Sequence, residues 1–118
     1  MAGLTTHILD TTRGRPASGV EIELHVVGPD GVRALVARAR TNADGRTDKP
    51  LIAAGDARVG VFELSFHIGD YFRVSGEKTT NPPFLDVVPI RFAISDPEAQ
   101  YHVPLVATPW SYSTYRGS

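Results

Sequence analysis

Apolar residues recur at every second position in four short segments of the chain. This alternation is typical of strands that bury one face and leave the other in contact with solvent. In the first two segments the alternate positions hold polar residues, among them Glu21, Glu23 and Glu63, so we expect those side chains on an outer face. The apolar sets that we expect to face the core are Val20, Ile22, Leu24 and Val26; Phe62, Leu64, Phe66 and Ile68; Val88, Ile90, Phe92 and Ile94; and Tyr101, Val103, Leu105 and Ala107.

Turn-forming residues separate these segments. The stretches "GPDG", residues 28–31, and "NADG", residues 42–45, bracket a further predicted strand over residues 32–40. Proline cannot donate a hydrogen bond to a sheet, so Pro89 and Pro104 should lie at a sheet edge, at a bulge or at the start of a strand. Seven or eight short strands with turn signals at this spacing predict an all-β, two-sheet sandwich.

One short segment favours a helix instead. In "GDYFRVSG", residues 69–76, Asp70 is a suitable N-cap and Gly76 is a suitable C-terminal stop. No internal repeat or low-complexity segment divides the chain. Its 118 residues therefore fit a single domain that spans residues 1–118.

The composition is that of a globular protein, with 42% apolar and 21% charged residues. A formal net charge of −1 and the lack of basic runs argue against a nucleic-acid or membrane-surface partner. The chain has no cysteine, which excludes disulfides, thiolate catalysis and thiolate zinc sites. The first residues lack the features of a signal peptide and no run approaches transmembrane length, so we expect a cytoplasmic protein.

The four histidines are the side chains best suited to acid–base chemistry near neutral pH. His25 and His67 alternate with glutamate or serine on the outer faces of predicted strands, so we expect both to be solvated. His7 and His102 lie on strand faces that point away from the core and carry apolar neighbours. That combination predicts a second buried surface, a subunit interface, in which each histidine is either a structural or a functional residue.

Motifs with known chemistry are scarce. The sequence lacks the HxH and HExxH spacings of zinc sites, so we predict no metal and no cofactor. It also lacks a GxSxG nucleophile elbow and a phosphate-binding glycine loop. Arg46, directly after a turn glycine, is typical of a solvated loop residue. The residues alone therefore predict an oligomeric β-sandwich and assign it no activity.

Three segments nevertheless resemble a known family. They are "LTTHILDTTRGRPASGV" at the start, "TNADGR" in the middle and "YHVPLVATPWSYSTYRGS" at the end. Together they are similar to the transthyretin-related family and, within it, to the 5-hydroxyisourate hydrolase branch. The terminal Tyr-Arg-Gly-Ser, residues 115–118, is typical of that branch and not of the hormone-carrying transthyretins. The likeness covers essentially the whole chain.

This resemblance implies a transthyretin-like, two-sheet β-sandwich of about eight strands with one short helix. It also implies a homotetramer with active sites along a channel between dimers, and a small-molecule substrate, an oxidised purine. The implied reaction is the hydrolysis of 5-hydroxyisourate in urate catabolism, in which the six-membered ring opens at a cyclic amide C–N bond. The chain departs from the family at Gln100 and Thr108, where histidine and serine are the more usual residues.

The resemblance also implies roles for individual residues. We expect His7 and His102 to activate water and shuttle protons, and Arg46 to bind substrate and stabilise the developing oxyanion. By strand alternation, Arg116 should point away from the side used by Tyr115 and form a structural ion pair. The implied catalytic residues are His7, Arg46, His102 and Ser118, and the implied substrate-binding residues are His7, Arg46 and Tyr115.

Two other functions remain open from the sequence. One is a non-catalytic, transthyretin-like tetramer that binds a small aromatic ligand in its central channel. The other is a purely structural or adhesive sandwich, since this fold serves many purposes. Histidines and an arginine suit a channel for a hydrophobic hormone less well than aliphatic side chains do, which favours the hydrolase.

Overall fold

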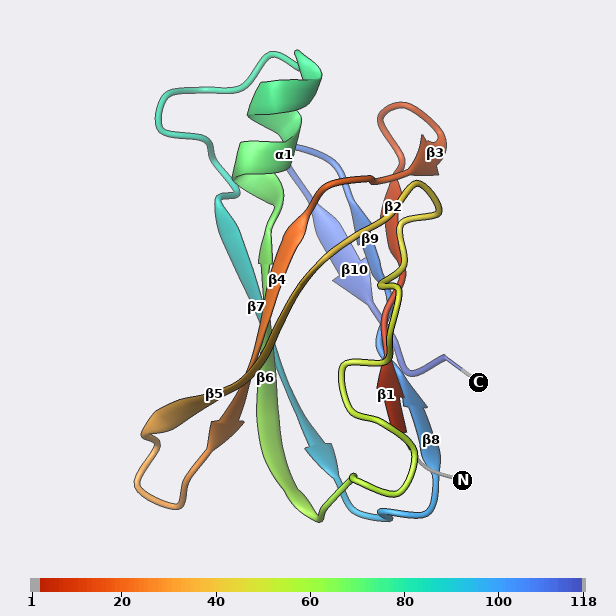
Figure 1. Cartoon of the computed structure of the whole chain (residues 1–118). Helices are drawn as coiled ribbons and strands as arrows, with labels where there is room; N and C mark the ends of the chain where they lie inside the picture. The colour runs from red at the N-terminus through yellow and green to blue at the C-terminus, as the bar shows by residue number, and fades with distance from the viewer. Residues whose placement is uncertain (1–2, 118) are drawn as a thin grey trace.

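Two facing layers of strands and one helix make up the described part of the chain (Figure 1). The computed structural model describes residues 3–117. The strands are β1 (Gly3–Thr5), β2 (Ile8–Asp10), β3 (Arg15–Pro16), β4 (Glu21–Val27), β5 (Arg33–Arg40), β6 (Gly60–His67), β7 (Val87–Ile94), β8 (Gln100–His102), β9 (Leu105–Ala107) and β10 (Tyr112–Thr114), and the helix is α1 (Ile68–Ser75).

One layer is an antiparallel sheet in the order β5-β4-β6-β7. Its inner face is apolar as predicted, since Leu24 pairs with Leu64 and Leu64 pairs with Ile90. The four predicted inward sets all contribute to the core or pack against it, which confirms the alternation. Pro89 lies in β7, an edge strand of this sheet, where a missing N–H costs no interior hydrogen bond.

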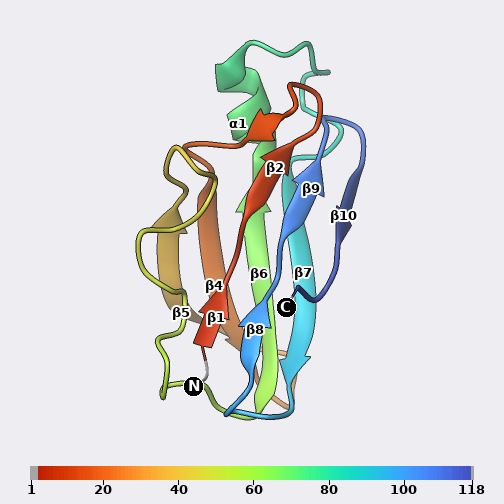
Figure 2. The same ribbon diagram turned by 90° about the vertical axis from the view of Figure 1, so that its right-hand side faces the viewer.

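The other layer contains the first and last strands of the chain. β1 pairs with β8 and β2 with β9, both in parallel, while β3 and β10 flank β2 and β9 (Figure 2). Pro104 lies between β8 and β9, and there the Thr6 hydroxyl donates to the Val103 carbonyl at 2.6 Å. Counting β1 with β2, and β8 with β9, as single interrupted strands gives eight strands in the described residues, as predicted.

Charged residues cover the outer face of the β5-β4-β6-β7 sheet more closely than alternation predicts. Glu63 was expected on the solvent side, yet it is only 8% exposed. Arg91 on the adjacent strand β7 and Arg33 on β5, beyond β4, flank it with N–O distances of 3.1 Å and 2.9 Å. These two ion pairs explain how the Glu63 carboxylate can be buried and still have charged partners.

The helix ends where the sequence predicts and begins earlier. Gly76 adopts a left-handed conformation, with φ at 88°, and terminates α1. The prediction that Asp70 is the N-cap is wrong, because the helix starts at Ile68 and Asp70 lies in its first turn. Ile68 is buried and the Gly69 N–H donates to the Asp86 carbonyl at 2.9 Å, so tertiary contacts set the start. Within residues 3–117 no helix is long and apolar enough to cross a membrane.

A buried carboxylate ties the helix to the second layer. Asp10 is 1% exposed and accepts hydrogen bonds from the Tyr71 hydroxyl at 2.7 Å and from the Arg13 N–H at 3.1 Å. Burial, followed by the hydrogen bond to Asp10, raises the pKa of Tyr71 to about 12. The phenol therefore stays protonated and keeps donating across the physiological pH range.

Removing this donor should destabilise the fold. We expect Tyr71→Phe to lower the free energy of unfolding by about 1–3 kcal/mol, because a buried carboxylate oxygen loses its partner. Urea denaturation measures the loss, with Arg73→Ala on the same helix as the control. Arg73 forms only an exposed pair with Asp70, so its loss should cost less than about 1 kcal/mol. Equal losses for the two variants would contradict this account.

Candidate active site

His102 lies on the outer face of the layer that contains β1 and β8. Its neighbours Tyr101 and Val103 point into the core, so the imidazole is directed the other way. The β1–β8 pairing sets Thr5 directly beside it, and the Thr5 hydroxyl lies 2.8 Å from His102 Nδ1. Either atom can donate, depending on the imidazole tautomer. This bond holds one edge of the ring.

His7 occupies the same face between β1 and β2. Thr6 and Ile8 on either side of it are buried, so His7 also points away from the core. Its carbonyl accepts the N–H of Leu105 at 2.9 Å, which ties this part of the backbone to β9. The two histidines therefore share one face of neighbouring strands, and both are half-buried in the single chain.

The turn at residues 42–45 places Arg46 beside these histidines. The Asn42 side chain accepts the N–H groups of Asp44 and Arg46, at 2.9 Å and 3.2 Å. Gly45 has a φ of 74°, and its carbonyl accepts the Ile8 N–H at 2.9 Å. A Cβ at Gly45 would lie 2.5 Å from the Ile8 carbonyl oxygen, so the close approach requires glycine. Arg46 is thus fixed to the strand that follows His7.

The electrostatic influence of Arg46 and His7 on His102 indicates that these three side chains form one cluster. Burial lowers the pKa of His102 below its ordinary value, and electrostatic interactions with Arg46 and then with His7 lower it further. The neutral imidazole is therefore the favoured form near pH 7. A neutral histidine beside a permanent cation combines a proton acceptor with a donor for negative charge, which is what hydrolysis of a carbonyl compound requires.

The C-terminal tail reaches the cluster by its backbone. β10 pairs with β9, and the Gly117 N–H donates to the His102 carbonyl at 2.8 Å. Tyr115 is 59% exposed and lines a cavity of about 300 Å³, which His7, Arg46 and His102 do not line. Within residues 3–117 the structure therefore brings three of the expected site residues together and places Tyr115 apart. Ser118 lies outside the described residues.

The cluster is open on one side. Three cavities within residues 3–117 have volumes of about 530, 430 and 300 Å³, and the cluster residues line none of them. His7 and His102 are half-buried on a sheet face, and Arg46 is an exposed residue of the adjoining loop. Another molecule must cover this face if water is to be excluded.

A model of the HIUase/Transthyretin family matches residues 4–117. The chain belongs to this family. A 5-hydroxyisourate hydrolase from Deinococcus radiodurans is 57% identical over 98% of this chain and 96% of that protein. The solved structure of the Klebsiella pneumoniae 5-hydroxyisourate hydrolase covers both chains completely, with 32% identity and a TM-score of 0.82.

One solved structure in this family comes from a longer chain. The crystal structure of an (S)-allantoin synthase matches 99% of this chain with 44% identity and a TM-score of 0.92. This chain spans 44% of the length of that protein. The transthyretin-like fold predicted from the sequence is thus confirmed both by the family match and by close structural likeness.

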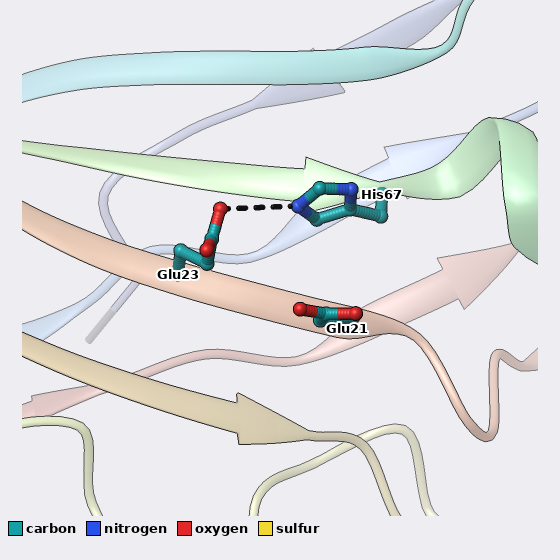
Figure 3. Close-up of side chains that lie close together, drawn as sticks. All are labelled: Glu21, Glu23 and His67. Atoms are coloured by element: carbon teal, nitrogen blue, oxygen red, sulfur yellow. Dashed lines mark hydrogen bonds and ion pairs between the residues drawn. The ribbon is translucent and has the colours of Figure 1, made fainter.

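A second polar group lies on the opposite layer. Glu21, Glu23 and His67 offer donor atoms within 4.8 Å of one another, a spacing that a metal ion could bridge (Figure 3). Their carboxylates already face cations, since Arg38 lies 2.9 Å from Glu23 and Arg40 lies 3.4 Å from Glu21. An ion pair network accounts for this group.

Two histidines of this layer, His67 and His25, are less solvated than expected. His67 is half-buried and lies 3.2 Å from Glu23, which is a hydrogen bond and not full solvation. His67 first, and then Arg38, hold the pKa of Glu23 below its usual value. His25 is also half-buried, and its Nδ1 has no hydrogen-bond partner among the described residues. Burial by neighbouring strands, which alternation does not reveal, makes both predictions wrong.

Thr5 is the site residue that the sequence analysis missed. Alternation places Thr5 on the same face as His7, which was the available signal. What alternation does not give is the strand that lies next to Thr5. Only the parallel pairing with β8 brings its hydroxyl to His102.

The charge of Arg46 should be measurable in the titration of His102. We expect Arg46→Gln to raise the pKa of His102, because a nearby positive charge disfavours the imidazolium ion. The pKa should stay below the ordinary value, since burial is the larger cause. NMR titration of the His102 ring measures the shift, with Arg73→Gln on α1 as the control. An unchanged or lower pKa in Arg46→Gln would show that the two side chains are not neighbours.

Proposed function

We propose that this chain is a 5-hydroxyisourate hydrolase that acts in urate catabolism. The observation that carries the proposal is the cluster of His7, Arg46 and His102 on one sheet face. Membership of the HIUase/Transthyretin family and full-length likeness to named 5-hydroxyisourate hydrolases support the same substrate. The substrate is a planar heterocycle with several carbonyl groups, and its six-membered ring opens at a cyclic amide C–N bond.

The reaction needs an activated water, charge stabilisation and a proton for the leaving nitrogen. Water adds its oxygen to the amide carbon, the C–N bond breaks, and the ring nitrogen takes up a proton. A neutral histidine can accept the proton from water, and the lowered pKa of His102 keeps that form populated. In this proposal His7 and His102 divide proton acceptance and proton donation between them.

Arg46 binds substrate and stabilises the tetrahedral intermediate. Its guanidinium remains charged at all relevant pH values and offers a planar set of donors to carbonyl oxygens. The turn that ends at Gly45 supports this role, because it fixes the backbone of Arg46 beside the strand that follows His7.

The last residues complete the proposed site. Tyr115 contributes a hydroxyl to substrate binding, and Ser118 contributes a hydroxyl to catalysis. The support for Ser118 is that it follows Gly117, whose N–H bonds to the His102 carbonyl.

We also propose that the protein acts as a homotetramer in the cytoplasm. The open face around His7 and His102 supports self-association, because a second copy packed there would turn an exposed cluster into an enclosed channel. Enclosure would remove bulk water from the reaction.

The ultraviolet absorbance of freshly generated 5-hydroxyisourate tests the proposal. Protein with no residues added after Ser118 should speed its decay, and His102→Ala should lower this activity by roughly 10²–10⁴-fold, the contribution of general acid–base catalysis. Arg73→Ala, an exposed substitution on α1, should retain full activity. No acceleration by the wild type would contradict the hydrolase and favour the ligand-binding tetramer.

A second arm of this experiment tests the tail. Ser118→Ala should lose activity and keep its thermal stability, because a proposed catalytic hydroxyl is removed while the sandwich is unaffected. Full activity in Ser118→Ala would remove the Ser118 hydroxyl from the proposed mechanism and leave the histidine cluster in place.

A further inference from the structure

Arg116 lies in the C-terminal tail but makes none of the expected ion pairs within residues 3–117. Its guanidinium carbon lies instead 4.3 Å from the centre of the Tyr101 ring. This distance is within the range of a cation–π interaction, in which a cation is attracted by the face of an aromatic ring. Nη2 of Arg116 also donates to the Gln100 carbonyl at 3.4 Å. Both contacts are to β8, the strand that carries His102.

Tyr101 provides a fixed platform for this contact. Its ring belongs to the core, and its hydroxyl accepts the N–H groups of Ser95 and Asp96, both at 3.1 Å. These backbone bonds lower the pKa of Tyr101. A ring that is held at both ends keeps its position when the tail moves, so Arg116 is anchored to a rigid part of the sandwich.

The tail needs such an anchor because little else supports it. A cavity of about 300 Å³ is lined by Thr114, Tyr115 and Arg116 together with Tyr101, so the tail is not closely packed along this side. Before Arg116, the hydroxyl of Thr114 donates to the Pro104 carbonyl at 2.7 Å. After Arg116, only the Gly117 N–H bond to the His102 carbonyl remains among the described residues.

Gly117 in turn presses against the imidazole. A Cβ at this position would lie 2.6 Å from His102 Cδ2, so only glycine allows the backbone to pass here. The opposite edge of the ring is held by Thr5 at Nδ1. The imidazole is therefore confined between Thr5 and Gly117, which leaves Nε2 as the nitrogen that can serve a reaction.

We propose that Arg116 is a positioning residue that holds Gly117 against His102 by stacking on Tyr101, and so fixes the orientation of the imidazole ring. Its catalytic consequence rests on the proposed hydrolase function. Without the stack, residues 115–117 move away from β8, and His102 gains freedom to rotate out of its productive orientation.

Hydrogen exchange tests, in the absence of substrate, whether Arg116 holds Gly117 against His102. In Arg116→Gln the Gly117 amide should exchange roughly 2- to 5-fold faster, the factor that corresponds to the loss of an exposed cation–π contact. The NMR signals of the His102 ring should shift or broaden in the same variant. Arg116→Lys, which keeps the cation, should lie between Arg116→Gln and the wild type. Arg73→Gln is the matched control and should change neither signal.

Kinetics test the consequence for catalysis. Arg116→Gln should lower kcat for 5-hydroxyisourate by a similar factor and leave KM nearly unchanged, because the orientation of His102 matters for the chemical step and not for binding. Unfolding midpoints should match the wild type, since Arg116 is a surface residue of the tail. Loss of kcat with faster Gly117 exchange would support the proposal.

Two results would overturn it. One is wild-type exchange at Gly117 and unchanged His102 signals in Arg116→Gln, which would show that the stack holds nothing in place. The other is faster exchange with an unchanged kcat, which would separate the tail from the orientation of His102. A wild-type protein without hydrolase activity would contradict the proposed function alone. The exchange experiment would still decide whether Arg116 holds Gly117 against His102.

Discussion

The site depends on one long-range constraint, the parallel pairing of the first strand segments with the last ones. Thr5 lies opposite His102, and Ile8 lies opposite Leu105, although 97 positions separate the residues of each pair. A parallel pair cannot be closed by a tight turn, so the whole β4–β7 layer must lie between its two strands in the sequence. The tertiary fold, and not a local segment of the sequence, therefore brings His7 and His102 to one face.

One proline and two glycines near this pairing set the local backbone geometry of the site. Pro104 has no N–H, and the sheet is interrupted next to His7, where Thr6 bonds to the Val103 carbonyl by its side chain. Two glycines then permit close approach. Gly45 passes against the Ile8 carbonyl and brings in the loop of Arg46, while Gly117 passes against the ring of His102. Proline and glycine residues thus help to set the positions of Arg46 and His102.

The sequence predicts the parts of this structure that depend on near neighbours. Alternation correctly placed His7 and His102 on a face away from the core, because strand geometry has a period of two. It could not show that the two strands are adjacent, and for that only the family resemblance was informative. The helix start at Ile68 was missed because burial outweighed the capping preference of Asp70. Arg116 was assigned an ion pair because alternation gives a direction and not a partner.

The central claim is that one chain assembles the histidine pair by itself. Mixing His7→Ala and His102→Ala proteins, with the subunits dissociated and reassociated together, tests it most directly. If both histidines of a site come from the same chain, every site in the mixture lacks one of them, and hydrolysis of 5-hydroxyisourate stays at the level of the separate variants. Recovery of activity on mixing would show that a site combines His7 of one subunit with His102 of another, and would contradict the account.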